Sequence, residues 1–120
     1  MAENYISIIS GKVAARIKVS DVVFIERNCR KLRIVTDNEE YSYYEKIENV
    51  SPLLDDRFYP CLKGCYINLE KVTSMSEQCI RFENGKMFNL GRENFIKAKQ
   101  RYRCFLQRTL KDKEPKRTLQ

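Results

Sequence analysis

Short apolar runs separated by turn-forming residues recur along this 120-residue chain, and no other feature restricts its fold as strongly. The pattern is clearest where the runs Tyr66–Leu69 and Val72–Met75 are separated by only two charged residues. Each run has the length of a strand rather than of a helix, and the second contains β-branched residues. Runs of this kind pair into antiparallel sheets, so we expect the chain to be mostly β-structure.

The segment just before these runs, Phe58–Gly64, departs from a simple strand pattern. Pro60 cannot donate a hydrogen bond to a neighbouring strand, so it belongs at a sheet edge or a strand start. Gly64 permits a backbone geometry that other residues resist. We therefore expect this segment to break the strand pattern and to form a loop that presents Lys63 to a partner.

The remaining strands are expected wherever similar runs are bounded by turn residues. The continuous apolar run Val22–Glu26 predicts a central strand. Asn84-Gly85 is a strong hairpin signal. The other expected strands are Tyr5–Ile9, Val13–Val19, Leu32–Thr36, Tyr41–Tyr44, Cys79–Phe82 and Met87–Leu90.

Two segments show helical rather than strand spacing. Residues 45–54 carry an apolar stripe that Pro52 interrupts, which predicts a short helix ending in an irregular turn. Residues 93–110 carry a longer stripe with basic residues largely off it, which predicts a C-terminal helix. Residues 111–120 are polar and lack an apolar pattern. We therefore expect one domain over residues 1–110, followed by a basic flexible tail.

The positive charge of the chain is concentrated near its C-terminus. Residues 1–96 contain 14 basic and 14 acidic residues, whereas residues 97–120 contain nine basic and two acidic residues and carry the whole surplus of +7. Such a segment suits a polyanionic partner. No run approaches the length of a membrane span, and the N-terminus does not resemble a signal peptide, so a cytoplasmic location is expected.

No pattern of catalytic or cofactor-binding residues stands out. The chain has no His, and it lacks both the phosphate-binding and the dinucleotide-binding glycine motifs. Its five Cys residues suit reduced thiols in the cytoplasm. Cys61 and Cys65 could form half of a zinc site, but no second close pair accompanies them, and the simpler interpretation is that the cysteines are small core residues. We expect a protein that is not an enzyme and that needs neither cofactor nor metal.

The segment Phe58–Val72 resembles the central signature of LytTR-type DNA-binding domains, which occur at the C-terminus of LytR/AlgR-type bacterial response regulators. Asp21–Glu26, the Asn84-Gly85 hairpin and Gly91-Arg92 are similar to further elements of that family in the same order, so the resemblance covers about residues 5–106. Within the signature the matching residues are Phe58, Cys61, Lys63, Ile67, Asn68, Leu69 and Val72. The departures are Pro60, Leu62 and Gly64, which stand where the family usually has Arg, His and Ser.

The resemblance implies an all-β fold with short helices, in which small antiparallel sheets stack into an elongated core beside a C-terminal helix. It also implies that inter-strand loops, rather than a recognition helix, enter successive major grooves of repeated sites. The candidate DNA-binding residues are Arg27, Asn28, Arg30, Lys31, Arg57, Lys63, Gly64 and Arg92.

Each candidate also has a simpler interpretation. Lys63 could be a solvated loop lysine, and the segment 27–31 could be a solvated turn. Arg92 could pair with Glu93, and Arg57 could form a surface salt bridge with Asp55 or Asp56. Asn68 has a structural interpretation, because a side-chain amide at a strand end can satisfy backbone groups of the following turn.

The expected function is that of a bacterial, sequence-specific transcription regulator that binds double-stranded DNA. Only about a dozen residues precede the strand at Val13, so we expect a stand-alone domain without a receiver. A homodimer on repeated sites and a regulatory protein partner stay open. The alternative function is a protein-interaction module of the same fold that binds DNA weakly and non-specifically through its basic C-terminus.

Overall fold

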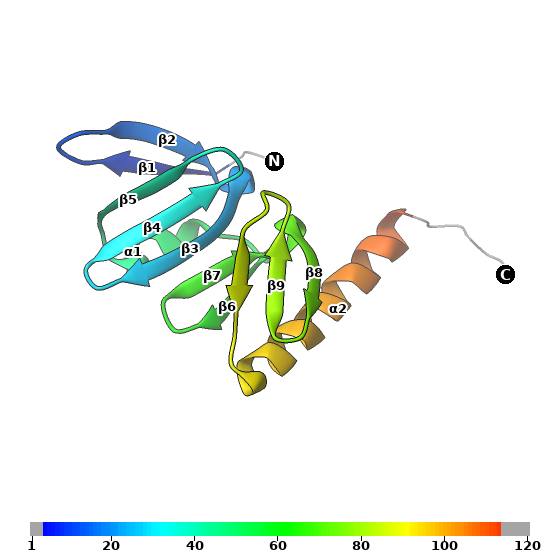
Figure 1. The fold of residues 1–120 in the computed structure, drawn as a ribbon. Coiled ribbons are helices and arrows are strands. Elements are labelled where there is room, and N and C mark those ends of the chain that lie inside the picture. Colours follow the sequence, from blue (N-terminus) through cyan, green and yellow to red (C-terminus); the bar gives the residue numbers. More distant parts are fainter. Residues whose placement is uncertain (1–3, 114–120) are drawn as a thin grey trace, which may run out of the picture.

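The computed structural model describes residues 4–113, with side chains from residue 4 to residue 109 (Figure 1). The strands are β1 Tyr5–Ile9, β2 Ala14–Lys18, β3 Val22–Asn28, β4 Lys31–Thr36, β5 Glu40–Tyr44, β6 Phe58–Leu62, β7 Cys65–Asn68, β8 Val72–Ser76, β9 Cys79–Phe82 and β10 Met87–Asn89. The helices are α1 Ile47–Val50 and α2 Arg92–Lys113, with the 3-10 turns η1 Val19–Asp21, η2 Ser51–Leu53 and η3 Leu69–Lys71.

The strands form three separate antiparallel sheets. β1 and β2 form a hairpin, β5-β4-β3-β7-β6 form a five-stranded sheet, and β10-β9-β8 form a three-stranded sheet. The pairing of β3 with β7 joins the first half of the chain to the second within one sheet. The expected all-β fold with short helices and a C-terminal helix is confirmed, and its extents of 58 × 36 × 24 Å make it elongated.

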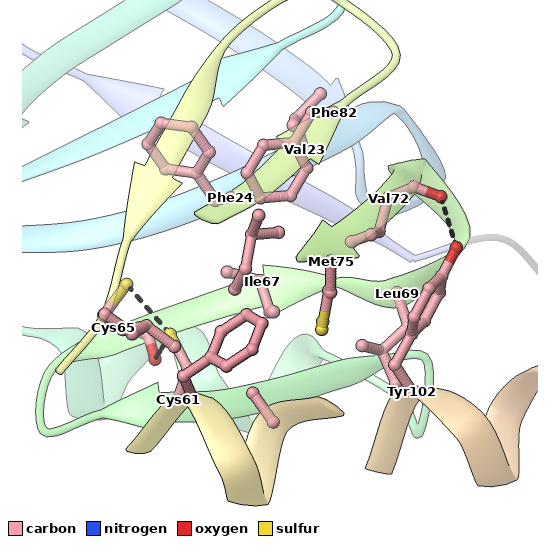
Figure 2. Packing of buried hydrophobic residues seen from close by; sticks show 14 of the residues in the cluster. Val23, Phe24, Cys61, Cys65, Ile67, Leu69, Val72, Met75, Phe82 and Tyr102 are labelled. Atoms are coloured by element: carbon pink, nitrogen blue, oxygen red, sulfur yellow. Dashed lines mark hydrogen bonds between the residues drawn. The ribbon is translucent and has the colours of Figure 1, made fainter. Parts of the chain in front are cut away.

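The centre of the five-stranded sheet is buried on both faces and lies in the middle of the domain. On one face, Ile25 and Ile34 pack with residues of the β1–β2 hairpin and of α1. On the other face, Phe24 and Ile67 pack with the three-stranded sheet and α2 (Figure 2). Because both faces of β3 are covered, the run Val22–Glu26 can be continuously apolar, and the prediction that it is central is confirmed.

Helix α2 is fixed to two sheets. Its buried residues Phe95, Ala98 and Tyr102 belong to the same cluster as Cys61 of β6 and Val72 of β8. The Tyr102 hydroxyl donates a 2.8 Å hydrogen bond to the backbone carbonyl of Val72 (Figure 2). Burial raises the pKa of Tyr102 and so further favours the protonated hydroxyl. The amphipathic pattern that predicted this helix therefore also identified its buried face.

The prediction that Phe58–Gly64 breaks the strand pattern is wrong for most of that segment. Phe58–Leu62 is strand β6, which lies at the edge of the five-stranded sheet. That position tolerates Pro60, as expected. The pairing with β7 shifts between Pro60 and Leu62, so a bulge rather than a loop absorbs the irregularity. Only Lys63 and Gly64 remain as the turn.

The polar segment 27–31 is also more regular than predicted. β3 continues to Asn28 and β4 begins at Lys31, so the connection consists of Cys29 and Arg30 alone. Cys29 adopts a φ of 61°. Non-glycine residues rarely occupy this left-handed region. Because the turn contains no glycine, the usual sequence signal for so tight a hairpin turn is missing.

The helices start and end close to their predicted positions. α1 is a single turn, and η2 follows it with Pro52 in its first turn, which confirms a short helix ending irregularly. α2 begins one residue earlier than predicted and extends three residues further, to Lys113. The rest of the predicted tail, residues 114–120, lies outside the described residues.

Asn68 has the structural role that its position predicted. It is fully buried at the end of β7. Its amide Nδ2 donates to the backbone carbonyl of Val22 at 2.8 Å, and its Oδ1 accepts from the backbone N of Glu70 at 2.9 Å. One side chain thus joins the start of β3 to the turn η3.

Candidate nucleic-acid interface

Two hairpin turns meet at one end of the five-stranded sheet. β3 pairs with β4 on one side and with β7 on the other, so the Cys29-Arg30 turn lies beside the Lys63-Gly64 turn. The backbone N of Arg27 donates a 2.8 Å hydrogen bond to the carbonyl of Gly64. Residues more than thirty positions apart in the sequence therefore form one continuous surface.

Gly64 makes this close approach possible in two ways. Its φ of 77° is a conformation that L-residues rarely adopt. A Cβ atom at this position would lie 3.2 Å from Cβ and 3.3 Å from Nε of Arg27, so the Arg27 side chain covers the glycine closely. The shape of the Lys63-Gly64 turn thus depends on a glycine and on an arginine from another strand.

The start of α2 is positioned by a different set of contacts. Gln78, in the turn between β8 and β9, donates from Nε2 to the backbone carbonyl of Leu90 at 3.0 Å, and its own carbonyl accepts from the backbone N of Leu90 at 3.0 Å. Gly91 then begins the helix, because its carbonyl accepts from the backbone N of Phe95 at 2.8 Å. Phe95 packs in the same buried cluster as Cys61 and Cys65, which flank the Lys63-Gly64 turn.

Five exposed cationic residues lie on these three elements, and we call them the basic row. In Figure 1 the β3–β4 turn, the β6–β7 turn and the yellow start of α2 lie along the same side of the domain. Among the described residues, none of the five forms an ion pair with a carboxylate. The basic row consists of Arg27, Arg30, Lys31, Lys63 and Arg92.

Neighbouring groups leave the charges of the basic row accessible. Glu26, the acidic residue just before the β3–β4 turn, is paired with Arg33 of β4 at 2.6 Å. The ammonium of Lys31 lies 5.1 Å from the centre of the Tyr44 ring, a cation–π arrangement that leaves its hydrogen-bond donors available. Asn28 is exposed beside these residues at the end of β3.

The chemistry of this surface suits nucleic acid. Guanidinium and ammonium groups bind phosphate oxygens, and an Arg fork also matches the O6 and N7 edge of guanine. An exposed Asn can pair with adenine in the same way. Because the donors lie in or beside two hairpin turns and at the start of α2, they can reach into a groove without a recognition helix.

Comparison with known proteins agrees with this chemistry. The chain matches the LytTr DNA-binding domain family over residues 13–103, which is more than half of its length. It belongs to the LytTR family. The fold is similar to that of a LytTr DNA-binding domain from Bacillus cereus, solved for a protein described as a putative methyl-accepting/DNA response regulator. The two share 11% identity with a TM-score of 0.68, and the match covers 83% of this chain and 97% of that one. No curated protein matched the sequence.

The family is one of DNA-binding domains rather than of enzymes, and membership supports a role in DNA-binding transcription regulation. It therefore agrees with the resemblance seen in the sequence. The match also spans every element that carries the basic row, from β3 to the start of α2.

Arg57 lies apart from the basic row in this LytTR domain. It precedes β6, whereas Lys63 follows it, so a five-residue strand of roughly 17 Å separates them. Its guanidinium forms an ion pair with Asp55, with Nη2 to Oδ2 at 2.7 Å, and its Nη1 lies 3.5 Å from Glu70. These contacts match the salt-bridge alternative that the sequence left open.

The cysteines show two behaviours. Cys61 and Cys65 are buried with their sulfurs 3.7 Å apart, as expected of small core residues, and the hydrogen bond between them together with burial raises the pKa of Cys65 (Figure 2). Cys29 and Cys104 are exposed, so the core interpretation is wrong for them. The described side chains, residues 4–109, include no group of three or more His, Cys, Asp or Glu that could hold a metal ion. The described part of the chain includes no helix long and apolar enough to cross a membrane.

Sequence reasoning missed two parts of this surface. Gln78 holds the segment before Arg92, but as one polar residue in a turn it carried no signal. The contact of Arg27 with Gly64 depends on the β3–β7 pairing, which no local pattern specifies. The glycine itself was a hint, since glycine often marks a close approach of the backbone.

Proposed function

We propose that this LytTR domain is a sequence-specific transcription regulator whose inter-strand turns read bases in the major groove. The observation that carries the proposal is the basic row, in which cations without ion pairs to described residues come from three separate elements and lie on one side of the domain. Family membership supports DNA as the partner. Without a polyanionic partner, the five cations of the basic row have no counter-charge from the described part of the protein.

Different members of the row have different roles in this proposal. Lys63 and Arg92 contact bases, because each projects from the end of an element and is exposed. Arg30 and Lys31 contact phosphates on either side, with Asn28 close enough to the turn to reach an adenine edge. Arg27 contacts DNA with its guanidinium while its stem covers Gly64.

The other two candidates act through the fold in this proposal. Gly64 shapes the turn and offers only its backbone to DNA. Arg57 serves the fold, because DNA contact would require it to leave Asp55 and Glu70.

The wider setting is part of the same proposal. We infer action in the bacterial cytoplasm on repeated sites, where two copies of the domain bind side by side. A single basic row spans too little DNA to define a long operator, so repetition would supply both affinity and specificity. A regulatory protein partner would bind a surface away from the row.

A second function is supported by the exposed face of α2. Lys97, Lys99 and Arg103 are exposed on this helix, whose only acidic residues are Glu93 and Asp112. Exposed helix cations of this kind bind phosphates without reading sequence. If this non-specific phosphate binding is the domain's main contact with DNA, its DNA binding is weak and its function is that of a protein-interaction module.

Selection from a random duplex library at physiological salt tests the proposal against this alternative. Under the first function a repeated motif is enriched, and Arg92→Ala removes the preference at one position of each repeat. The matched control is Arg103→Ala, which removes the same charge from the exposed face of α2 and should preserve the motif. Bulk, salt-sensitive binding without any motif would instead favour the protein-interaction module.

A further inference from the structure

The turn between β8 and β9 has an unusual backbone conformation. Ser76 pairs with Cys79, so Glu77 and Gln78 alone form the turn. Both residues have positive φ values, 54° and 61°. A two-residue turn with positive φ at both positions usually contains Asn, Asp or glycine. The β9–β10 hairpin follows this preference with Gly85, whereas the β8–β9 turn contains two residues that this conformation strains.

Gln78 makes two hydrogen bonds from this strained position. Its backbone carbonyl accepts from the backbone N of Leu90, and its Nε2 donates to the backbone carbonyl of Leu90, each at 3.0 Å. Any residue at position 78 could make the first bond. Only the second depends on the side chain, so the amide is the feature that a more favourable turn residue such as glycine would lose.

The partner of this amide lies directly before Arg92. Leu90 is only 4% exposed and belongs to the same buried cluster as Phe95. Gly91 alone separates Leu90 from Arg92, and its carbonyl accepts from the backbone N of Phe95 at 2.8 Å. The backbone of Arg92 is therefore held on one side by Leu90, which is bonded to Gln78, and on the other by a buried aromatic residue.

An arginine that reads a base depends on its orientation more than one that binds phosphate. To recognise guanine, two donors of the guanidinium must align with O6 and N7 together, whereas a phosphate accepts hydrogen bonds from many directions. Loosening the backbone before Arg92 should therefore reduce base discrimination more than general attraction to DNA. Residues with strained backbones often occur at functional sites, where the strain serves to place a group.

We propose that Gln78 is a positioning residue whose side-chain amide holds the Leu90 carbonyl, so that Arg92 presents its guanidinium in the orientation needed to read a base. Gln78 itself does not contact DNA. This inference rests on the proposed function, in which Arg92 contacts a base. It accounts for a glutamine at a positive φ, because glycine would relieve the strain but remove the donor.

The test compares Gln78→Gly with the matched control Glu77→Gly. Glycine suits the positive φ at either position, so both variants keep the turn, and both keep the backbone bond to Leu90. Selection with Arg92→Ala first identifies the base pair that Arg92 reads. Fluorescence polarisation at fixed salt then gives the ratio of affinities for the enriched duplex and for a duplex changed at that base pair.

The ratio should respond to the side chain of Gln78 alone. Gln78→Gly should lower it by about fivefold, the factor that corresponds to the net contribution of one hydrogen bond. Affinity for the changed duplex should stay as it is in the intact chain. Glu77→Gly should leave both affinities unchanged, since the Gln78 amide is still present.

A double-mutant cycle separates positioning from a general effect on structure. When Arg92→Ala is already present, Gln78→Gly should change neither affinity, because no guanidinium remains to be positioned. A structural role alone would lower both affinities in either background.

The outcomes distinguish this inference from the proposed function. An unchanged ratio in Gln78→Gly, an equal loss of affinity for both duplexes, or an equal fall of the ratio in Glu77→Gly would overturn the role of Gln78 alone. An enriched motif in which Arg92→Ala alters no position would overturn the base contact of Arg92, and the role of Gln78 with it. The absence of any enriched motif would overturn the proposed function as a whole.

Discussion

The two ends of the five-stranded sheet use cationic side chains in opposite ways. At one end the basic row is exposed and has no ion pairs with described residues. At the other end each cation faces a carboxylate: Lys71 lies 2.8 Å from Asp37 and 4.0 Å from Glu83, and Arg57 pairs with Asp55 and Glu70. We call these residues the paired end.

The difference shows why composition alone could not locate the binding surface. Residues 1–96 have no net charge, yet their cations are distributed unevenly between compensated and uncompensated positions. A cation beside a carboxylate gains little from a phosphate, because it must first give up its existing partner. The basic row has no such cost, so its charges are available to a ligand.

The largest effect is expected beside the paired end. Asn68→Ala removes both hydrogen bonds of a fully buried amide and leaves the Val22 carbonyl and the Glu70 N–H without that partner. The expected loss in the free energy of unfolding is about 2–4 kcal/mol. Urea denaturation followed by circular dichroism measures it.

Asn49→Ala is the matched control for Asn68→Ala. Its amide also donates a hydrogen bond, to Glu45 at 2.6 Å, but on the exposed surface. The change should therefore cost less than about 0.5 kcal/mol. Equal effects of the two substitutions would show that Asn68 does not join β3 to η3 energetically.

The next largest effect separates the two ends directly. Lys63→Met and Lys71→Met each remove one ammonium and keep most of the stem. Lys63→Met should weaken DNA binding by about 1–3 kcal/mol while stability stays within about 0.5 kcal/mol of the original. Lys71→Met should lower stability by roughly 0.5–1 kcal/mol and leave DNA affinity nearly unchanged.

Fluorescence polarisation measures the DNA affinity of each variant, and urea denaturation measures its stability. The comparison between the ends fails if Lys71→Met weakens DNA binding as much as Lys63→Met does. That result would mean that net charge, rather than the absence of a carboxylate partner, determines affinity.

Glycine substitutions test the shape of the turn. Gly64 and Gly85 both have positive φ values, 77° and 89°, but only Gly64 lies against another side chain. Gly85→Ala should therefore cost about 1 kcal/mol for backbone strain alone. Gly64→Ala adds the contact with Arg27 and should cost more, about 1–2 kcal/mol, and it should also weaken DNA binding. An equal cost at both positions, with DNA binding intact, would show that the approach of Arg27 does not shape the surface.

Local sequence patterns predicted most of this fold, because most of its strands, turns and helices are determined by residues that are close together in the sequence. The strand Tyr5–Ile9 was predicted to the residue. Asn84-Gly85 correctly marked the hairpin between β9 and β10. The edge position of Pro60 followed from its missing N–H. The failures arose where tertiary pairing decides. Strand β6 persists through Pro60 because β7 pairs with it across a bulge.

The candidate site was harder to predict for the same reason. Lys63 and Arg92 stood out beside glycines, and the resemblance to a family named them. Nothing local distinguished Arg57, which is paired, from Arg27, which lies over Gly64. The distinction depends on the β3–β7 register and on which carboxylates the fold brings near each cation, and neither is encoded within a short window of sequence.

Alkaline pH should weaken the fold through buried tyrosines. Burial, with a smaller contribution from Glu45, raises the pKa of Tyr43 to about 12. Because an unfolded tyrosine titrates near about 10, the stability from this group is fully present below that pH and is lost as the pH rises toward about 12. Tyr43→Phe should flatten that decline in urea midpoints measured from about pH 9 to 11.5. Tyr44→Phe, on an exposed ring, should leave the decline unchanged, and a decline unaffected by Tyr43→Phe would contradict the assignment.

The smallest effect concerns the exposed face of α2, a third group of cations. Lys97 and Lys99 are exposed like the basic row but lie further along α2, rather than at a hairpin turn or at the start of the helix. Replacing both with Gln should leave the selected motif unchanged and lower the slope of log affinity against log salt by about 0.9 for each phosphate that is no longer neutralised. Lys63→Met should lower that slope and also change the selected sequence. If the Lys97 and Lys99 changes altered the motif instead, the helix beyond its first residue would read bases, and an exposed cation would not need to lie at a turn or at the start of α2 to confer specificity.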